Sequence, residues 1–230
     1  MGTPKYKINK KFFTNKNEEY WYFLGLISSD GYISDEKVEL CLNEKDEHIL
    51  VTLRDLISPD KPIYDKPSTN AKKFVINSKE VAKMLKNELG MITNKKSLEI
   101  TFPNVPNNML RHYVRGLIDG DGCIDTTKGY RGEKVYIGPR LRILGNKTFL
   151  SDMLKAIKVQ VPNNTKAVSK KGNENVWYIT YNFSTARNIL NWCYENSHIY
   201  LLRKYNKYNE VIRWRYSLDP LLISVKVLRK

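Results

Sequence analysis

The sequence has few of the residues that build disulfide frameworks or zinc knuckles. Its three cysteines, Cys41, Cys123 and Cys193, lie far apart, and none belongs to a Cys-x-x-Cys pair. Its three histidines show no spacing typical of metal ligands. An odd number of scattered cysteines argues against a disulfide-stapled scaffold and favours a reducing compartment.

Long apolar runs are also scarce. The longest, Tyr20 to Ile27, is far too short to span a bilayer, and residues 1–10 contain no apolar signal core. We therefore expect an intracellular protein without a membrane partner, either in the cytoplasm of a prokaryote or phage host or in an organelle matrix.

Acidic residues are outnumbered by basic ones. The chain has 24 Asp and Glu against 39 Lys and Arg, a formal charge of +15, and the basic residues are spread along its length. This balance favours a polyanionic partner such as nucleic acid. A lysine-rich soluble protein without such a partner would show the same balance, so charge alone leaves both interpretations open.

The two halves of the 230-residue chain repeat each other. Residues 22–33 read YFLGLISSDGYI and residues 113–124 read YVRGLIDGDGCI, an offset of 113 − 22 = 91. Weaker echoes follow in the same order, with apolar helical patterns at 49–57 and 149–157. Two copies of a supersecondary unit are too few for a solenoid and indicate a pseudo-two-fold pair of modules.

Each copy changes its periodicity in the same way. Residues 18–30 are apolar nearly all round, as in a buried helix, and Gly31 can end that helix in the left-handed conformation. Strand-like alternation follows, at Val38 to Leu42 in the first copy and from Trp177 to Phe183 in the second. We expect an α+β fold of two αββαββα modules, whose sheets are apolar on one face and polar on the other.

The proline- and asparagine-rich stretch between the copies is the natural linker. We therefore assign residues 1–102 to an N-terminal module, 103–108 to the linker and 109–216 to a C-terminal module. Residues 217–230 are assigned to a C-terminal arm.

The repeated motif carries features that point to chemistry. Small residues lie four apart on each helix, Gly25 and Ser29 in the first copy and Gly116 and Gly120 in the second. Because positions i and i+4 share a helix face, two such helices can pack closely and bring the following aspartates, Asp30 and Asp121, together. Two carboxylates at helix C-termini repel each other, and Mg²⁺ would relieve that repulsion.

These residues resemble a known family. Residues 23–31 and 114–122 look like the two LAGLIDADG motifs of monomeric homing endonucleases, and the resemblance covers nearly the whole chain. It implies modules packed through their motif helices, with two sheets forming a saddle on double-stranded DNA. It also implies site-specific hydrolysis giving short 3′ overhangs, by a monomer that needs no protein partner and is intron-encoded or free-standing.

The resemblance further implies the site residues. Asp30 and Asp121 carry over as catalytic metal ligands, with Ser29 and Gly120 as further metal-site residues. Mg²⁺ is the expected cofactor, Mn²⁺ should substitute, and Ca²⁺ should bind without supporting cleavage. Ser28 departs from the family's Asp two residues before the metal ligand, whereas Asp119 keeps it.

A supporting basic residue is implied in each module. We expect these to be Lys96 and Lys204, with Lys95 and Lys207 as the alternatives. A cation there could stabilise charge on the phosphate or help to activate water.

The polar sheet faces and hairpin tips are the expected DNA-binding surface, where alternate side chains read bases and lysines hold phosphates. The candidates on strand faces are Lys37, Lys73, Arg140, Arg142, Tyr178 and Asn182. The candidates on hairpin tips are Lys66, Lys72, Lys128, Arg131, Lys134, Lys166, Lys170 and Lys171.

Two other functions use the same fold. A protein of this kind can act as an RNA maturase that assists intron splicing, or as a DNA-binding regulator that has lost cleavage. Retention of both Asp30 and Asp121 argues against the regulator. It leaves a combined endonuclease and maturase open.

Overall fold

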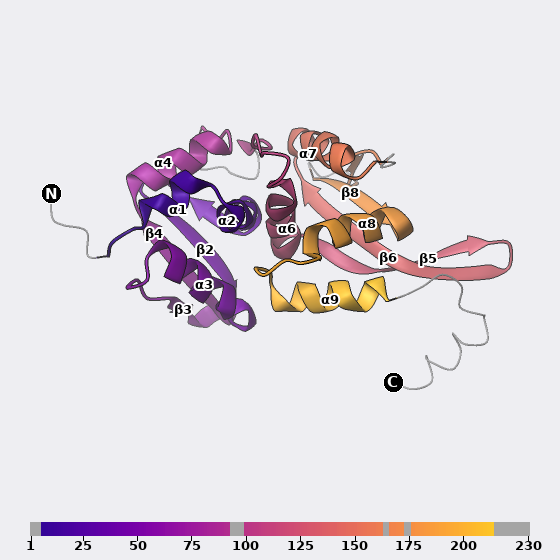
Figure 1. Ribbon diagram of the computed structural model, residues 1–230, viewed down its shortest axis with the longest axis horizontal. Coiled ribbons are helices and arrows are strands. Elements are labelled where there is room, and N and C mark those ends of the chain that lie inside the picture. The colour runs from indigo at the N-terminus through magenta and orange to yellow at the C-terminus, as the bar shows by residue number, and fades with distance from the viewer. Residues whose placement is uncertain (1–5, 93–98, 163–165, 173–175, 214–230) are drawn as a thin grey trace.

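The structure is a computed structural model that describes residues 6–92, 99–162, 166–172 and 176–213. It contains two four-stranded antiparallel sheets, one in each half of the chain, and each sheet carries helices (Figure 1). The expected α+β architecture of paired modules is confirmed. Within the described residues no helix is long and apolar enough to cross a membrane.

The first half begins with a short helix, α1 (Lys10–Asn15), and the motif helix α2 (Glu18–Ser29). The hairpin β1 (Gly31–Ile33) and β2 (Lys37–Asn43) follows, and then the 3-10 turn η1 (Glu44–Asp46) and α3 (Glu47–Ile57). The second hairpin joins β3 (Tyr64–Lys66) to β4 (Ala71–Asn77) through the 3-10 turn η2 (Pro67–Thr69) and leads into α4 (Lys79–Glu88). The strand order is β1-β2-β4-β3.

The second half repeats this order with a longer first hairpin. The motif helix α6 (Leu110–Gly120) leads into β5 (Cys123–Arg131) and β6 (Lys134–Gly145), and α7 (Lys147–Gln160) follows. The strands β7 (Ser169–Lys170) and β8 (Trp177–Asn182) are followed by α8 (Phe183–Tyr194) and α9 (Leu202–Ile212). The order β5-β6-β8-β7 matches that of the first sheet, and the β5–β6 hairpin projects beyond the helices (Figure 1).

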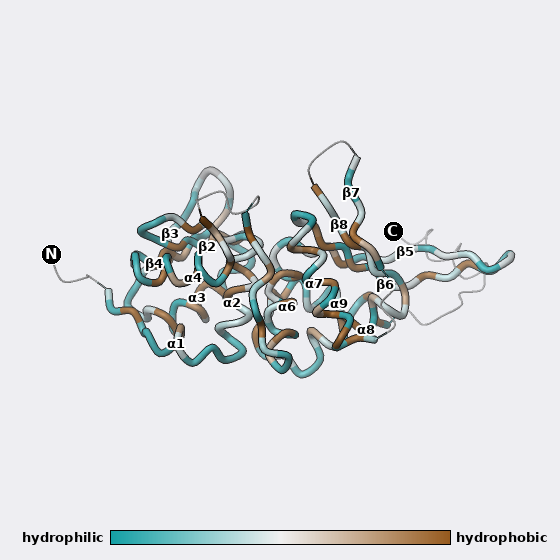
Figure 2. Tube along the Cα trace, turned by 90° about the horizontal axis from the view of Figure 1, so that it is seen from above, coloured by the Kyte–Doolittle hydropathy of each residue, from teal (hydrophilic) through white to brown (hydrophobic). Residues whose placement is uncertain are grey.

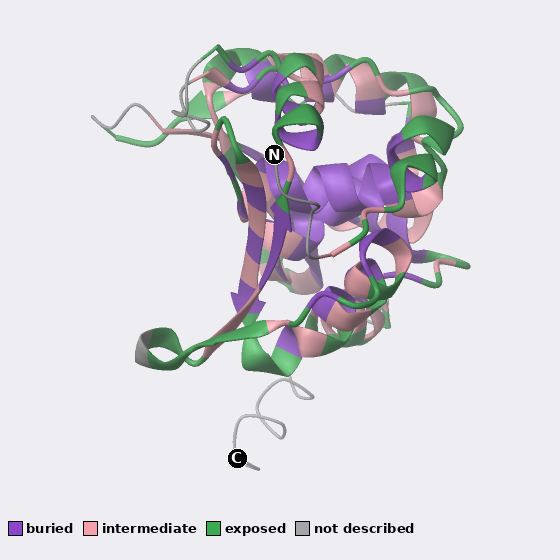
Figure 3. Ribbon diagram, turned by 90° about the vertical axis from the view of Figure 1, so that its left-hand side faces the viewer, coloured by how far each residue is buried: buried purple, intermediate pink, exposed green. Residues whose placement is uncertain are grey.

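The two motif helices lie side by side at the centre of the molecule. Tyr20 through Ile27 are almost completely buried, and Tyr113, Val114 and Ile118 are buried with them. Figure 3 shows this core as a purple central body, with the sheets on one side and the outer helices around it. A helix that is apolar all round needs neighbours on every side, and here the second motif helix covers the side left open by the sheet.

The sheets bury alternate residues. Along β2, Val38, Leu40 and Leu42 are buried against the helices, whereas Lys37 and Cys41 face the other way and are half-buried. Figure 2, seen from above, places the strands of both sheets along one side of the molecule and α1, α8 and α9 along the other. The expected polar faces therefore lie on a common side.

Two local expectations were wrong. Gly31 does not adopt a left-handed conformation but is the first residue of β1. Glycine is needed there because a Cβ would lie 2.6 Å from the Cα of Ile27. Phe183, expected on the strand, instead starts α8 with φ +50°. Its ring lies against Gly129, where a Cβ would be 2.6 Å from the Phe183 Cζ atom.

Candidate active site and nucleic-acid interface

The backbones of the two motif helices touch. A Cβ on Gly25 would overlap the carbonyl oxygen of Tyr113 and lie 2.9 Å from the Cα of Gly116. A Cβ on Gly116 would in turn overlap the carbonyl oxygen of Tyr22. Only glycine permits this approach, which holds the helices parallel with equivalent residues opposed.

The parallel arrangement brings both aspartates to one end of the helix pair. Asp30 caps α2, with its backbone N–H donating to Leu26 O at 2.8 Å, and Asp121 caps α6 in the same way. A Cβ built on Gly120 would lie 3.0 Å from Oδ2 of Asp30. The Asp30 carboxylate therefore lies against the residue that precedes Asp121. Ser29 packs against the same glycine, 2.6 Å from its Cβ position.

A pair of equivalent tyrosines bridges the helices just behind the aspartates. The Tyr22 hydroxyl donates to Oδ2 of Asp119 at 2.7 Å. The equivalent Tyr113 hydroxyl lies 3.0 Å from Oγ of Ser28, whose own proton goes to Leu24 O. Both contacts span the interface, and both join residues related by the repeat, since 22 + 91 = 113 and 28 + 91 = 119.

Asp119 is the centre of a buried polar network. It also accepts hydrogen bonds from the Tyr194 hydroxyl at 2.5 Å and from the Leu201 N–H at 2.8 Å. Burial raises the pKa of Asp119 to about 6, although these hydrogen bonds and the nearby Arg115 oppose the rise. The guanidinium of Arg115 is itself fully buried and donates to the carbonyls of Ile199 and Cys193. This network holds the loop between α8 and α9 in place, and so positions α9 beside the aspartates.

Lys204, on α9, lies beside the aspartates. Its ammonium donates to the carbonyl of Gly122, the residue after Asp121. Burial, and then the neighbouring Arg203, lower the pKa of Lys204, while Asp119 and Asp30 raise it. Lys207, by contrast, pairs with Glu210 at 2.9 Å on its own helix. The candidates Lys95 and Lys96 lie outside the described residues.

The sequence analysis missed an ion pair between the modules. Nε of Arg203 donates to Oδ2 of Asp46 at 2.8 Å, and the Asp46 side chain is only 2% exposed. These residues come from η1 and α9, which are 203 − 46 = 157 positions apart. No repeat or spacing signals such a contact, because it joins non-equivalent residues of the two copies.

The open face of the second sheet carries an organised cluster of arginines. Nε and Nη2 of Arg140 both donate to Asp125 at 2.7 Å, and Arg142 donates to Asp125 at 3.1 Å. Partial burial acts to raise the pKa of Asp125, but the hydrogen bond and charge of Arg140 and the charge of Arg142 lower it overall. Beside the arginines is a hollow of about 560 Å³, whose lining includes Lys171 and Tyr178. Asn182 lies opposite Arg140 in the ladder.

The remaining candidates of this half lie on or near its hairpins. Three are on the projecting β5–β6 arm, and two are exposed at β7 or just before it; they are Lys128, Arg131, Lys134, Lys166 and Lys170.

The first sheet places its lysines on different faces. Lys73 is opposite Cys41 and Tyr64 on the open face, and Lys66 is exposed on β3. Lys37, also on the open face, pairs with Glu39 at 2.5 Å. Lys72 is opposite the buried Leu42 and pairs with Glu47 of α3 at 3.3 Å, so it lies on the side that the helices cover.

No model of a known protein family and no curated protein matches the sequence. Solved structures do match the fold. One is the I-LtrWI LAGLIDADG homing endonuclease bound to target DNA, with 16% identity and a TM-score of 0.56, covering 86% of this chain and 90% of that one. The meganuclease I-SmaMI bound to uncleaveable DNA matches at 11% identity and a TM-score of 0.60, over 86% and 90% of the two chains.

A third match is the LAGLIDADG meganuclease I-AabMI bound to uncleaved DNA, at 12% identity and a TM-score of 0.60 over 86% of this chain and 89% of that one. The protein therefore has the fold of the LAGLIDADG homing endonucleases. The resemblance noted in the two sequence motifs is confirmed at the level of the fold.

Proposed function

We propose that the protein is a divalent-metal-dependent endonuclease that binds and cuts double-stranded DNA as a monomer. The proposal rests on one observation above all. Asp30 and Asp121 lie at the same end of the motif helices, between two sheets with polar open faces. The DNA complexes of the proteins with this fold support the same partner. Residues 1–102 and 109–216 would be the two DNA-binding modules.

The aspartates fit a hard divalent cation such as Mg²⁺. Asp121 is exposed, its side chain makes no hydrogen bond or ion pair with any part of the chain that the structure describes, and the carboxylate of Asp30 lies against the preceding Gly120. Both carboxylates stand at helix C-termini, where the dipole disfavours negative charge and a cation is stabilising. Carboxylate oxygens completed by water and phosphate are the ligands Mg²⁺ prefers. Ser29 and Gly120 would border this site.

Side chains of the protein would stabilise the transition state and hold the catalytic groups in position. A bound divalent cation supplies polarisation of the phosphate and a lowered pKa for water. Lys204 brings a fixed positive charge to the end of α6, where it would stabilise the extra negative charge of the phosphorane-like transition state. The Asp119 network holds the start of α9 and therefore the position of that lysine.

The open sheet faces would hold the DNA. Arg140 and Arg142 are held by Asp125 with their guanidinium groups beside the 560 Å³ hollow, an arrangement suited to the acceptor edges of guanine. Lys73, Lys66 and the lysines of the β5–β6 arm would contact phosphates. We further propose recognition of one long site, with short 3′ overhangs after cleavage.

The test is a cleavage screen of the purified protein with Mg²⁺ against a randomised duplex library, followed by sequencing of the cut ends. We expect one cut site, and sedimentation should show one protein per duplex. Asp30→Asn and Asp121→Asn should each abolish cutting of both strands while folding and binding persist. Asp60→Asn, at an exposed turn after α3, is the matched control and should cut normally.

Each failure has a distinct meaning. Normal double-strand cleavage by either motif variant would remove the catalytic assignment. Specific DNA binding without cleavage by the unaltered protein would identify a regulator, and binding to intron RNA in preference to duplex DNA would identify a maturase.

A further inference from the structure

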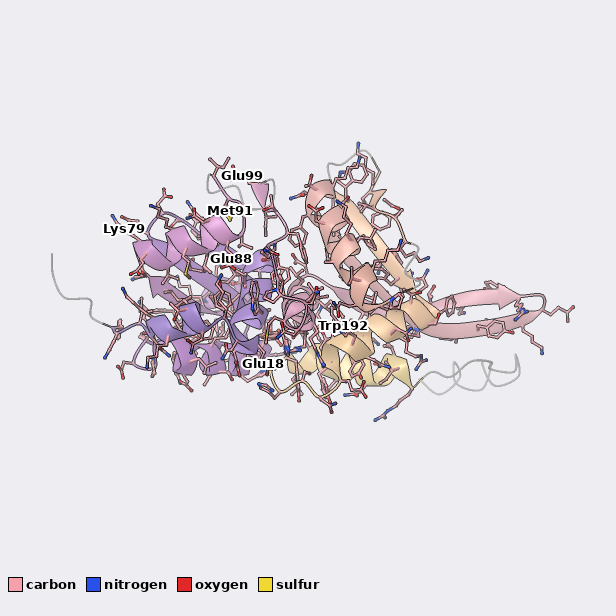
Figure 4. The ribbon with its side chains drawn as sticks, turned by 45° about the horizontal axis from the view of Figure 1, so that its top comes forward. Glu18, Lys79, Glu88, Met91, Glu99 and Trp192 are labelled. Carbon is pink, nitrogen blue, oxygen red and sulfur yellow. The ribbon has the colours of Figure 1, made fainter. Side chains whose placement is uncertain are left out.

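A second group of polar side chains gathers at the other end of the motif helices. Glu18 and Glu19 come from the first turn of α2, and His112 comes from the first turn of α6. His198 joins them from the loop between α8 and α9. Glu18 lies at the junction of the two modules (Figure 4). Because the helices are parallel, this group is separated from Asp30 and Asp121 by the length of α2.

Three ligand atoms converge within the group. One carboxylate oxygen each from Glu18 and Glu19 and a ring nitrogen of His198 all lie within 4.8 Å of one another. Nε2 of His198 is 3.2 Å from Oε1 of Glu19 and also contacts Oε1 of Glu18. That Glu18 oxygen is buried, and among the described residues its close contact is with Nε2 of His198. Two carboxylate oxygens thus converge on one imidazole nitrogen, and buried carboxylate charge of this kind needs either a proton on that nitrogen or a bound cation.

His112 orients this group and is not one of its ligands. Nδ1 of His112 is 3.1 Å from Nη2 of Arg115, and arginine can only donate, so Nδ1 must accept. The neutral ring then carries its proton on Nε2, which lies 3.4 Å from Oε2 of Glu18. His112 therefore holds the second oxygen of Glu18 and leaves the first directed toward His198. Orienting contacts of this kind accompany most metal-bound carboxylates and histidines.

We propose that Glu18, Glu19 and His198 form a transition-metal site that binds Zn²⁺ and links the first module to the second. An imidazole nitrogen with two carboxylates suits Zn²⁺, whereas Mg²⁺ and Ca²⁺ prefer oxygen ligands alone. The His198 side chain is 62% exposed, which leaves the fourth position open to water. The glutamates belong to α2 and the histidine to the second half, so the ion joins the modules. This site does not depend on the proposed nuclease function.

The experiment is calorimetric titration of the full chain with Zn²⁺, together with thermal unfolding with and without the ion. The variants are His198→Ala and Glu19→Gln, and His48→Ala is the matched control because it removes a histidine from α3 instead. A protein carrying both Asp30→Asn and Asp121→Asn excludes binding at the other end of the helices. Circular dichroism verifies that each variant folds.

We expect one Zn²⁺ per chain in the unaltered protein, in His48→Ala and in the double aspartate variant, each with a raised midpoint of unfolding. His198→Ala and Glu19→Gln should bind about tenfold or more weakly and lose the Zn²⁺-dependent rise. Co²⁺ in place of Zn²⁺ should show visible absorption without a thiolate charge-transfer band. Absence of binding, equal binding by His198→Ala, or loss of binding in the aspartate variant would each overturn the proposal.

Discussion

Asp119 and Ser28 occupy equivalent positions in the two copies, yet they do different things. Ser28 satisfies its hydroxyl on Leu24 and Tyr113, within the helix pair. Asp119 instead gathers Tyr22, Tyr194 and the Leu201 N–H, and so reaches across to α8 and α9. The duplication has therefore kept the interhelical bridge in both copies and used one of them to anchor a further helix.

The raised pKa of Asp119 has a consequence for stability. Its pKa of about 6 in the fold exceeds the value of about 4 expected for an unfolded chain. The folded state therefore binds more protons between these values, and the group's contribution to stability falls as the pH rises through this window. Well above pH 6 the loss is complete and amounts to about 3 kcal/mol, since the shift is about two pKa units and each is worth ~1.4 kcal/mol.

Asp119→Asn removes this titration and can retain the acceptor for Tyr22 and the Leu201 N–H. We expect urea unfolding at pH 4.5 and pH 7.5 to show a smaller pH-dependent decrease in the free energy of unfolding for the variant than for the unaltered protein. Equal pH dependence of the two proteins would mean that Asp119 is not the group responsible.

Lys204 provides a residue-scale test of the site. Lys204→Met keeps the length of the side chain but removes the charge that lies beside Gly122, next to Asp121. We expect the cleavage rate to fall about 100-fold, as when one charge-stabilising donor is removed from an active site, with DNA affinity nearly unchanged. Lys207→Met is the matched control, because its ammonium pairs with Glu210, and a similar loss there would reverse the assignment.

At the scale of elements, the motif helices depend on two glycines that face each other. A Cβ on Gly116 would lie 2.9 Å from the backbone nitrogen of Leu26 and 3.0 Å from the Cα of Gly25. Backbone atoms cannot move aside as a flexible side chain can. The helices must separate, and the aspartates at their ends must separate with them.

Gly116→Ala should therefore destabilise the protein by ~1–3 kcal/mol and reduce cleavage. In the middle of a helix, replacing glycine with alanine normally stabilises the protein by ~1 kcal/mol. A decrease in the free energy of unfolding of Gly116→Ala must therefore come from the steric clash. Gly145→Ala is the control, since the three atoms nearest to its Cβ would belong to side chains, the nearest at 3.3 Å. Denaturant unfolding of both variants decides the matter, and unchanged stability in Gly116→Ala would contradict the observed packing.

The helices and strands themselves could be predicted from the sequence, because burying one face of an element makes apolar residues recur at a fixed spacing. The alternation of Val38, Leu40 and Leu42 requires a strand with one buried face, and the repeated motif requires the strands to recur. The end of β8 could not be predicted this way. The alternation continues through Phe183, but Gly129 leaves room for that ring and the chain turns into α8.

Contacts between non-equivalent parts of the two copies could not be predicted from the sequence either. The aspartates could be paired from the repeat, because two-fold symmetry opposes equal positions. Arg203 with Asp46, and His198 with Glu18, join positions that symmetry does not relate. Lys72 shows a further limit, because it was expected on a hairpin tip and the register places it against α3.

For the whole molecule, a formal charge of +15 and two polar sheet faces on a common side should make the proposed binding to DNA electrostatic in large part. Each phosphate neutralised by a lysine or arginine releases condensed counterions, so affinity falls as salt rises. With about six to ten such contacts, affinity for duplex DNA should drop by roughly 10³–10⁵ between about 50 and 200 mM salt. A flat dependence would count against the extended interface.

The position of the charge can be tested separately from its total. Lys73 lies on the open face of the first sheet, opposite Cys41 and Tyr64, and Lys73→Ala should lower the slope of log affinity against log salt by about one. Lys79→Ala makes the same change in net charge on α4, where the lysine is exposed and paired with Glu36 at 3.0 Å (Figure 4). If the polar sheet face is the DNA surface, Lys79→Ala should leave the slope unchanged and lower affinity only slightly at low salt, because its charge acts at a distance and is screened. Equal slopes for the two variants, measured by fluorescence anisotropy on one duplex across a salt series, would show that net charge and not the sheet face determines binding.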